Sequence, residues 1–266
     1  MPIANRRRCR IHYDLDGEPG APPLLMLRGL ARSARHWSRV RPLLVDRFRL
    51  VLVDNRGVGR SDAPLGAYTT GAMADDAVAV LDDAGVDRAH VFGMSLGGMI
   101  AQQVALRHPG RVDRLILGCT TPGGRRAVRI PLRSALTLLG SVALPLDRAL
   151  ALTAPLVHTP AFLERDPEAV ATMRAIAIEE GVRRSGVLGQ IAAAALHDAF
   201  AELARIDRPT LVVTGDADRI VPPVNSEILA AAIPGARVHI MRGVGHDFAT
   251  ERPAETAALI AAFLLT

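Results

Sequence analysis

The stretch HVFGMSLGG, residues 90–98, carries the strongest local signal in the chain. Gly93, Ser95 and Gly97 form the pattern G-x-S-x-G directly after a short apolar run and directly before a helical pattern. In that setting the glycines permit a tight strand-to-helix turn, which lifts the serine hydroxyl clear of a sheet while the amides of the helix N-terminus point at the same space. The alternative is a packing turn that merely contains a serine. The stretch therefore predicts a strand, a turn bearing a reactive serine, and a helix.

The alternation of short apolar runs with longer helical patterns continues along the chain and is typical of a mostly parallel sheet covered by helices. After an N-terminal hairpin around residues 10–13, we expect strands at residues 24–27, 50–53, 89–92, 114–117, 211–214 and 238–241. We expect helices at residues 72–84, 99–107 and 254–265. The predicted fold class is therefore α/β.

One interval interrupts this alternation. About ninety residues separate the strand ending near residue 118 from the next strand, far more than an ordinary connection needs. They contain several helical patterns, including 167–181 and 187–204, and no convincing strand. We therefore predict a core domain made of residues 1–120 and 208–266, with residues 121–207 inserted as a helical cap.

The composition of the predicted cap bears on its ligand. It is rich in Leu, Ala, Val and Ile and has hardly any aromatic residues, which favours a bulky, apolar substrate. Arg125, Arg126, Arg129 and Arg133 near its start either form a solvated basic stripe or guide an anion toward the mouth of a pocket.

Length and composition exclude several classes of protein. A chain of 266 residues, 49% hydrophobic and 22% charged, is neither disordered nor fibrous and buries a sizeable core. Two cysteines, Cys9 and Cys119, provide neither a disulfide framework nor a zinc cluster. All 32 cationic residues are Arg, which indicates a GC-rich bacterial genome rather than a nucleic-acid-binding face, and nine aromatic residues are few for stacking on bases.

Localisation and partners follow from the same features. The basic cluster Arg6–Arg10 precedes no apolar stretch, so we expect neither a signal peptide nor a membrane anchor. The longest apolar stretch, residues 135–157, is interrupted by prolines and charges that are costly in a bilayer. We expect a cytoplasmic monomer or homodimer whose partner is a small-molecule substrate, with no nucleic acid and no membrane.

A reactive serine requires a base, and the base requires an orienting carboxylate. Among eight histidines, His246 in GVGHDF lies just beyond the last predicted strand, between small residues that let the loop turn back. Asp216 and Asp218 follow the preceding strand, at the sheet edge where loops collect ligands. We favour Asp218 as the acid because Asp216 adjoins the turn and stabilises it. Asp247 is too near His246 in the chain to orient its ring.

The chain order Ser95, Asp218, His246 and the elements that bear them resemble the α/β-hydrolase superfamily over nearly the whole chain. LLMLRGLARSARHW, residues 24–37, resembles the family's strand followed by H-G-x. LVLVDNRGVGRSDAP, residues 50–64, resembles its D-x-R-G-x-G-x-S loop, which we interpret as structural and not as a phosphate-binding loop. The resemblance implies a mostly parallel eight-stranded sheet with helices on both faces, and an inserted helical cap at residues 121–207.

Within the superfamily, the sequence is most similar to 3-oxoadipate enol-lactone hydrolases, cofactor-free haloperoxidase-like esterases and esterases that tailor polyketides. By this resemblance, the backbone amides of Leu30 and Leu96 form an oxyanion hole. Arg28 replaces the usual histidine before Gly29 and either anchors the loop by ion pairing or binds substrate. The substrate-binding candidates are Arg28, Leu30 and Trp37. No metal or organic cofactor is implied.

The sequence thus predicts a serine hydrolase that cleaves a carboxylic ester, lactone or thioester through an acyl-enzyme on Ser95. Two alternatives stay open. An enzyme of the same fold can cleave or form carbon–carbon bonds without an acyl-enzyme, for example in bacterial specialised metabolism. A ligand-binding receptor with vestigial catalysis is the other.

Overall fold

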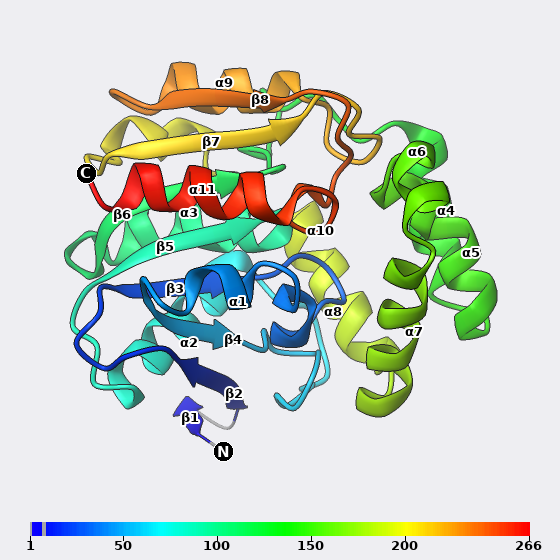
Figure 1. The fold of residues 1–266 in the computed structure, drawn as a ribbon, viewed down its shortest axis with the longest axis horizontal. Coiled ribbons are helices and arrows are strands. Elements are labelled where there is room, and N and C mark those ends of the chain that lie inside the picture. The colour runs from blue at the N-terminus through cyan, green and yellow to red at the C-terminus, as the bar shows by residue number, and fades with distance from the viewer. Residues whose placement is uncertain (1, 7–8) are drawn as a thin grey trace.

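The computed structural model describes residues 2–6 and 9–266 and shows a central sheet between two layers of helices (Figure 1). Its eight strands are β1 (Ile3–Arg6), β2 (Cys9–Asp16), β3 (Pro23–Leu27), β4 (Arg49–Val53), β5 (Ala89–Met94), β6 (Val112–Gly118), β7 (Thr210–Gly215) and β8 (Arg237–Met241). The helices of the core are α1 (Arg41–Leu44), α2 (Thr70–Asp83), α3 (Leu96–Arg107), α9 (Val224–Ala232), α10 (Phe248–Glu251) and α11 (Pro253–Leu264). The predicted fold class and each predicted strand are confirmed.

The strand order places the ends of the parallel strands at one edge. The order is β1-β2-β4-β3-β5-β6-β7-β8, in which the pairs β1–β2 and β2–β4 are antiparallel and all the others are parallel. The carboxyl ends of β3 to β8 therefore share one edge, and the additional helices lie beyond it (Figure 1). Loops at such an edge are where an α/β sheet builds its sites.

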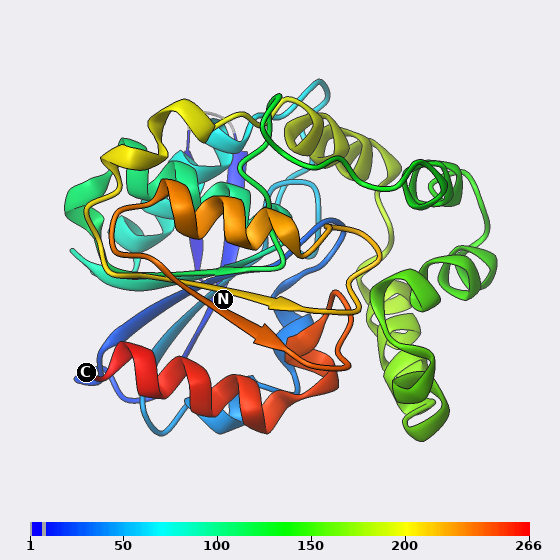
Figure 2. The same cartoon turned by 90° about the horizontal axis from the view of Figure 1, so that it is seen from above.

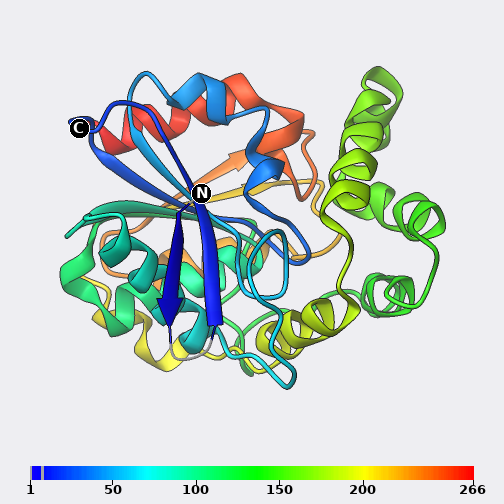
Figure 3. The same cartoon turned by 90° about the horizontal axis from the view of Figure 1, so that it is seen from below.

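Alternate strand residues supply two separate cores, because successive side chains of a strand point to opposite faces. Leu25 and Leu27 pack with α2, α3 and α9, whereas Leu24 and Met26 pack with α1 and α11. Figures 2 and 3 show these two helical layers on opposite sides of the sheet. Burial on both faces explains why the strands appear in the sequence as continuous apolar runs.

The segment between β6 and β7 is helical. It contains α4 (Leu132–Ser141), α5 (Leu146–Val157), α6 (Pro160–Arg165), α7 (Glu168–Glu180), α8 (Arg184–Ala195) and the 3₁₀ turn η3 (Phe200–Arg205). Leu150, Ala154 and Met173 form a small apolar cluster of their own at its far end. Leu203 of η3 instead belongs to the main core. The core of residues 1–120 and 208–266 and the cap of residues 121–207 stay a prediction.

The prediction of one helical stretch over residues 187–204 is wrong. Helix α8 ends at Ala195, and Asp198 then forms an isolated antiparallel bridge with Gly123. This bridge ties the two ends of the insertion together, because Gly123 lies just after β6 and Asp198 lies shortly before β7. A contact between residues so distant in sequence has no signature in local helical periodicity.

At the N-terminus, acidic side chains of the core hold the described members of the basic cluster. Arg6 pairs with Asp75 at 2.5 Å and Arg10 pairs with Asp62 at 3.1 Å. Arg7 and Arg8 of the predicted cluster lie outside the described residues. Across residues 2–6 and 9–266, no helix has the length and apolar character needed to cross a membrane.

The first turn of α3 lies against the end of β3, and this contact yields a stability prediction. A Cβ built on Gly97 would lie 2.0 Å from the carbonyl oxygen of Leu27, so the helix would have to shift. We expect Gly97→Ala to lower the free energy of unfolding by about 1–3 kcal/mol, as overpacking does. Gly110→Ala is the control, since a Cβ there meets nothing within 4 Å. Urea denaturation of both variants makes the comparison, and equal losses would contradict the steric argument.

Candidate active site

Ser95 occupies the strained turn between β5 and α3. Its backbone adopts φ 56° and ψ −119°, a region that residues with a Cβ seldom occupy. The turn is tight because a Cβ on Gly93 would lie 2.2 Å from the carbonyl oxygen of Gly97. Ser95 is half-buried, at the start of α3 and at the carboxyl edge of the sheet. This is the geometry expected of a nucleophile elbow.

Hydrogen bonds between the β7 and β8 loops bring Asp218 and His246 together. Asp216 donates its N–H to the carbonyl of Met241, and Ala217 donates to that of Val244. The Asp216 carboxylate accepts a hydrogen bond of 2.7 Å from the amide of Gly243. Asp216 thus stabilises the loops, as its sequence context suggested. Asp218, two residues further along the chain, reaches the histidine.

The Asp218–His246 pair is buried and fully oriented. His246 Nδ1 lies 2.7 Å from Asp218 Oδ2, while Asp218 Oδ1 accepts the amides of Ile220 at 2.8 Å and Val221 at 2.9 Å. Burial lowers the pKa of His246, but the negative charge of Asp218 and the hydrogen bond that its carboxylate accepts from the ring outweigh burial and raise that pKa well above its usual value. Donation from Nδ1 leaves Nε2 as the basic nitrogen.

The serine and the histidine lie on neighbouring backbone segments. Ser95 donates its N–H to the carbonyl of Gly118 at 2.8 Å and accepts the Thr120 hydroxyl on its own carbonyl at 2.8 Å. Between these two residues lies Cys119, whose Sγ is within 4.8 Å of the ligand atoms of His246 and Asp218. Within the described ranges, no hydrogen bond joins the Ser95 hydroxyl to His246. Catalytic hydrogen bonds are often long without substrate and tighten in the complex.

Two backbone amides near Ser95 have the properties of an oxyanion hole. The loop after β3 approaches Ser95 closely, since a Cβ on Gly29 would lie 3.0 Å from Ser95 Cβ and 3.5 Å from its Oγ. Among described residues, neither the amide of Leu30 nor that of Leu96 has a hydrogen-bond partner. Unpaired donors held by a rigid loop and by a helix N-terminus can stabilise a developing oxyanion.

Arg28 and Trp37, two of the three substrate-binding candidates, are both enclosed in the protein interior. Arg28 is 3% exposed and its two terminal nitrogens bind the Asp247 carboxylate at 2.7 and 3.2 Å. Its guanidinium stacks 4.6 Å from the centroid of the Trp37 ring, and Trp37 itself is 1% exposed against Phe92. Of the two roles open to Arg28 in the sequence, the structure shows the ion-paired anchor. Leu30 keeps partial exposure and stays a candidate.

The Arg28–Asp247 pair joins the two loops that carry the candidate site. Arg28 is two residues before Leu30, and Asp247 directly follows His246. Burial alone would raise the pKa of Asp247, yet the adjacent Arg28 guanidinium holds it well below its usual range. The carboxylate therefore stays charged and paired, and is not available to the histidine.

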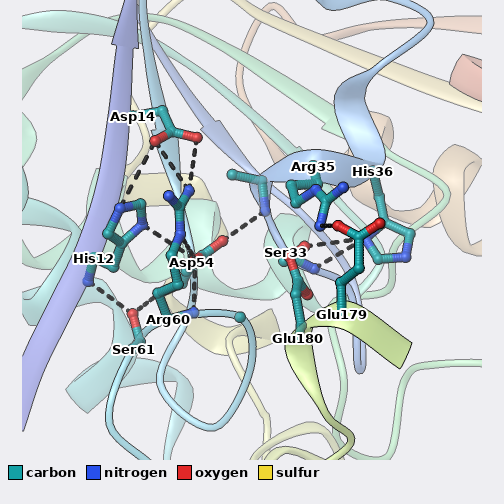
Figure 4. Close-up of polar contacts among 12 residues, drawn as sticks. His12, Asp14, Ser33, Arg35, His36, Asp54, Arg60, Ser61, Glu179 and Glu180 are labelled. Carbon is teal, nitrogen blue, oxygen red and sulfur yellow. Dashed lines mark hydrogen bonds and ion pairs between the residues drawn. The ribbon is translucent and has the colours of Figure 1, made fainter. Parts of the chain in front are cut away.

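The D-x-R-G loop has the structural role that its sequence indicated. Asp54 is 1% exposed, and its carboxylate accepts the amides of Ala34 at 2.8 Å and Arg60 at 2.9 Å and lies 3.1 Å from His12 Nδ1 (Figure 4). Arg60 in turn binds Asp14 of β2. These contacts fix the loop after β4 to the segment that follows the predicted oxyanion loop.

Helices of the insertion bind the same segment. The Ser33 hydroxyl donates to Glu180 at 2.8 Å and Arg35 pairs with Glu179 at 2.6 Å, both at the end of α7 (Figure 4). The fully buried side chain of Gln190 in α8 accepts the amide of Ala31 at 2.9 Å and donates to the carbonyl of Arg56 at 2.8 Å. The insertion is therefore attached directly to the loop that contains Leu30.

Sequence reasoning missed Cys119 and Gln190. Cys119 directly follows β6, at the same edge as Ser95, Asp218 and His246, and that position could have drawn attention to it. It has a positive φ of 39° and its amide donates to the carbonyl of Val213 at 2.7 Å. No local signal distinguishes Gln190, whose partners lie far away in sequence.

Comparisons with known proteins agree with this geometry. A family model described as alpha/beta hydrolase fold matches residues 22–253. The chain belongs to that family. It is 30% identical to a putative carbamate hydrolase, RutD, of Stutzerimonas stutzeri, over 89% of each chain.

Solved structures give the same assignment. An enol-lactonase from Burkholderia xenovorans superposes with a TM-score of 0.90 at 26% identity, covering 100% of both chains. A hydrolase from Pseudomonas aeruginosa gives a TM-score of 0.89 at 31% identity, covering 100% of this chain and 98% of that one. The predicted membership of the superfamily and the predicted resemblance to enol-lactonases are confirmed, and the chain is a hydrolase of the α/β-hydrolase fold.

The buried Arg28–Asp247 pair yields a prediction for stability. We expect Arg28→Met or Asp247→Leu alone to cost about 3–5 kcal/mol, because each leaves an unpaired buried charge. The double variant should cost much less than the sum of the two. Arg174→Met is the matched control, since Arg174 and its partner Asp147 are exposed and such pairs contribute about 0–1 kcal/mol. A double-mutant cycle by urea denaturation measures the coupling, and additive losses would contradict it.

Proposed function

We propose that this hydrolase cleaves a carboxylic ester, lactone or thioester through an acyl-enzyme on Ser95. The observation that carries the proposal is the arrangement at one sheet edge: a serine in a strained turn, a buried Asp218–His246 pair, and two amides without partners. Each of these groups has a defined task in acyl transfer.

In this mechanism the Ser95 hydroxyl attacks the substrate carbonyl and His246 Nε2 takes its proton. The amides of Leu30 and Leu96 stabilise the oxyanion, and removal of one such donor typically costs about 10²–10³ in rate. His246 returns the proton to the leaving group, and Asp218 keeps the ring oriented throughout. Water then attacks the acyl-enzyme by the same route, so His246 and Ser95 regain their starting forms.

The substrate proposed is a bulky, largely apolar small molecule. The insertion beyond the site is rich in aliphatic side chains, and Leu132, Leu136 and Leu152 on α4 and α5 are 74%, 61% and 49% exposed. An insertion rich in aliphatic side chains suits an apolar acyl or alcohol group better than a small polar one. The names of the relatives support ester-like chemistry, since enol-lactonases open lactones.

The first test replaces the nucleophile. We expect Ser95→Ala to lower kcat for p-nitrophenyl esters of short and medium-chain acids by about 10⁶-fold, as loss of a catalytic serine does in other enzymes. A fluorophosphonate probe should label the wild type and not the variant. Mass spectrometry of the wild type stalled with a slow ester should show an acyl adduct on Ser95, which an enzyme acting without an acyl-enzyme lacks.

Ser141→Ala is the control for this test. Ser141 lies at the end of α4, where its hydroxyl donates to the carbonyl of Leu138 in the same helix. The variant should therefore retain turnover and labelling. Undiminished hydrolysis by Ser95→Ala would refute the proposal. Tight ligand binding without turnover of any ester would favour the receptor alternative.

The raised pKa of His246 predicts the pH dependence. The base must be neutral, so kcat/KM should rise with pH through an ionisation above the usual histidine value of about 6.5. Asp218→Asn removes the charge that favours the imidazolium and should move this ionisation to lower pH. It should also lower kcat by about 10⁴-fold, because the ring loses its orienting partner. An unchanged midpoint of the pH profile in Asp218→Asn would show that Asp218 does not act on the titrating group.

A further inference from the structure

Cys119 is a buried nucleophilic group that the proposed mechanism does not use. Cys119, Asp218 and His246 each offer a ligand atom, all three residues are buried, and the three atoms lie within 4.8 Å of one another. They come from the loops after β6, β7 and β8, so only the fold brings them together. A thiolate, an imidazole and a carboxylate are the usual zinc ligands.

The spacing of these atoms is close to that of a metal site. Tetrahedral zinc bonds of about 2.0 Å to nitrogen and oxygen and about 2.3 Å to sulfur place the ligand atoms roughly 3.3–3.5 Å apart. His246 Nδ1 and Asp218 Oδ2 are 2.7 Å apart, so they would separate by about half an ångström. Cys119 Sγ, which is now at most 4.8 Å from the other two ligand atoms, would move closer to them.

The surroundings keep two of the ligands in place. Asp218 Oδ1 is held by the amides of Ile220 and Val221, so Oδ2, which bonds only the His246 ring among the described residues, is the oxygen that can bind a metal. The backbone of Cys119 is fixed by its bond to Val213, and its Sγ lies within 4.8 Å of the ligand atoms of Asp218 and His246. The side chain of His246 is 10% exposed, whereas that of Asp218 is fully buried.

We propose that Cys119, Asp218 and His246 bind a thiophilic divalent cation, with zinc as the example, and that the bound ion reversibly inhibits the enzyme. Bonds form from the metal to Sγ, Nδ1 and Oδ2, and the His246–Asp218 hydrogen bond breaks. The thiol proton leaves to solvent, and the proton of the neutral ring moves from Nδ1 to Nε2. A ring protonated at Nε2 cannot accept the Ser95 proton, so turnover stops. The inhibition, but not the binding, rests on the proposed function.

Binding is tested with Co²⁺ as a spectroscopic probe of the full-length protein. Wild type should develop a thiolate-to-cobalt charge-transfer absorption that excess Zn²⁺ displaces and that EDTA abolishes. Cys119→Ala and Cys119→Ser should lack this absorption. Cys9→Ala is the matched control, since Cys9 is the other buried thiol and lies in β2, and it should keep the absorption.

Inhibition is tested with ZnCl₂ in the ester assay, each variant being compared with its own metal-free rate. The zinc inhibition constant should rise at least about tenfold in Cys119→Ala and Cys119→Ser, and stay unchanged in Cys9→Ala. Absence of the thiolate absorption in wild type, or equal zinc inhibition of wild type and both Cys119 variants, would overturn the proposal. If the protein fails to hydrolyse esters, the cobalt absorption still decides whether the metal site exists.

Discussion

The close approach of the first turn of α3 to the ends of β3 and β5 is the constraint on which the candidate site depends. Side chains at Gly93 and Gly97 would collide with backbone carbonyls, so the helix starts as near the sheet as a chain permits. Ser95 has a positive φ of 56° in that turn, and Leu96 begins the helix with an amide that has no hydrogen-bond partner among the described residues. Strain at one residue is tolerated because packing on every side determines its position.

Two buried aspartates at the site each have their own partner. Asp218 pairs with His246, whereas Asp247 pairs with Arg28 beneath Trp37. Each buried carboxylate has a cationic or hydrogen-bonding partner, which is the condition for keeping charge in a dry interior. Because Arg28 neutralises Asp247, the aspartate beside the histidine does not compete with Asp218 for the ring.

The helical insertion is hydrogen-bonded to both loops of the candidate site, the one that contains Leu30 and the one that contains His246. Gln190 binds the loop containing Leu30, and the amide of Asp247 donates to the carbonyl of Val157 at the end of α5. Glu251 receives the amides of Gly245 and Thr159, which ties the histidine loop to the start of α6. A displacement of the insertion would therefore move the loop that contains Leu30 and the loop that contains His246.

The sequence by itself determined the strands, their α/β alternation, the turn at Ser95 and the choice of Asp218 over Asp216, since periodicity and turn chemistry are local properties. It also indicated a helical segment between β6 and β7, although not the break in the pattern over residues 187–204. Only the tertiary structure decided that Arg28 is an anchor, that Trp37 is enclosed and that Cys119 lies close to His246. The reason is physical: the partner of Arg28 lies 219 residues away, and such contacts exist only once the sheet has assembled.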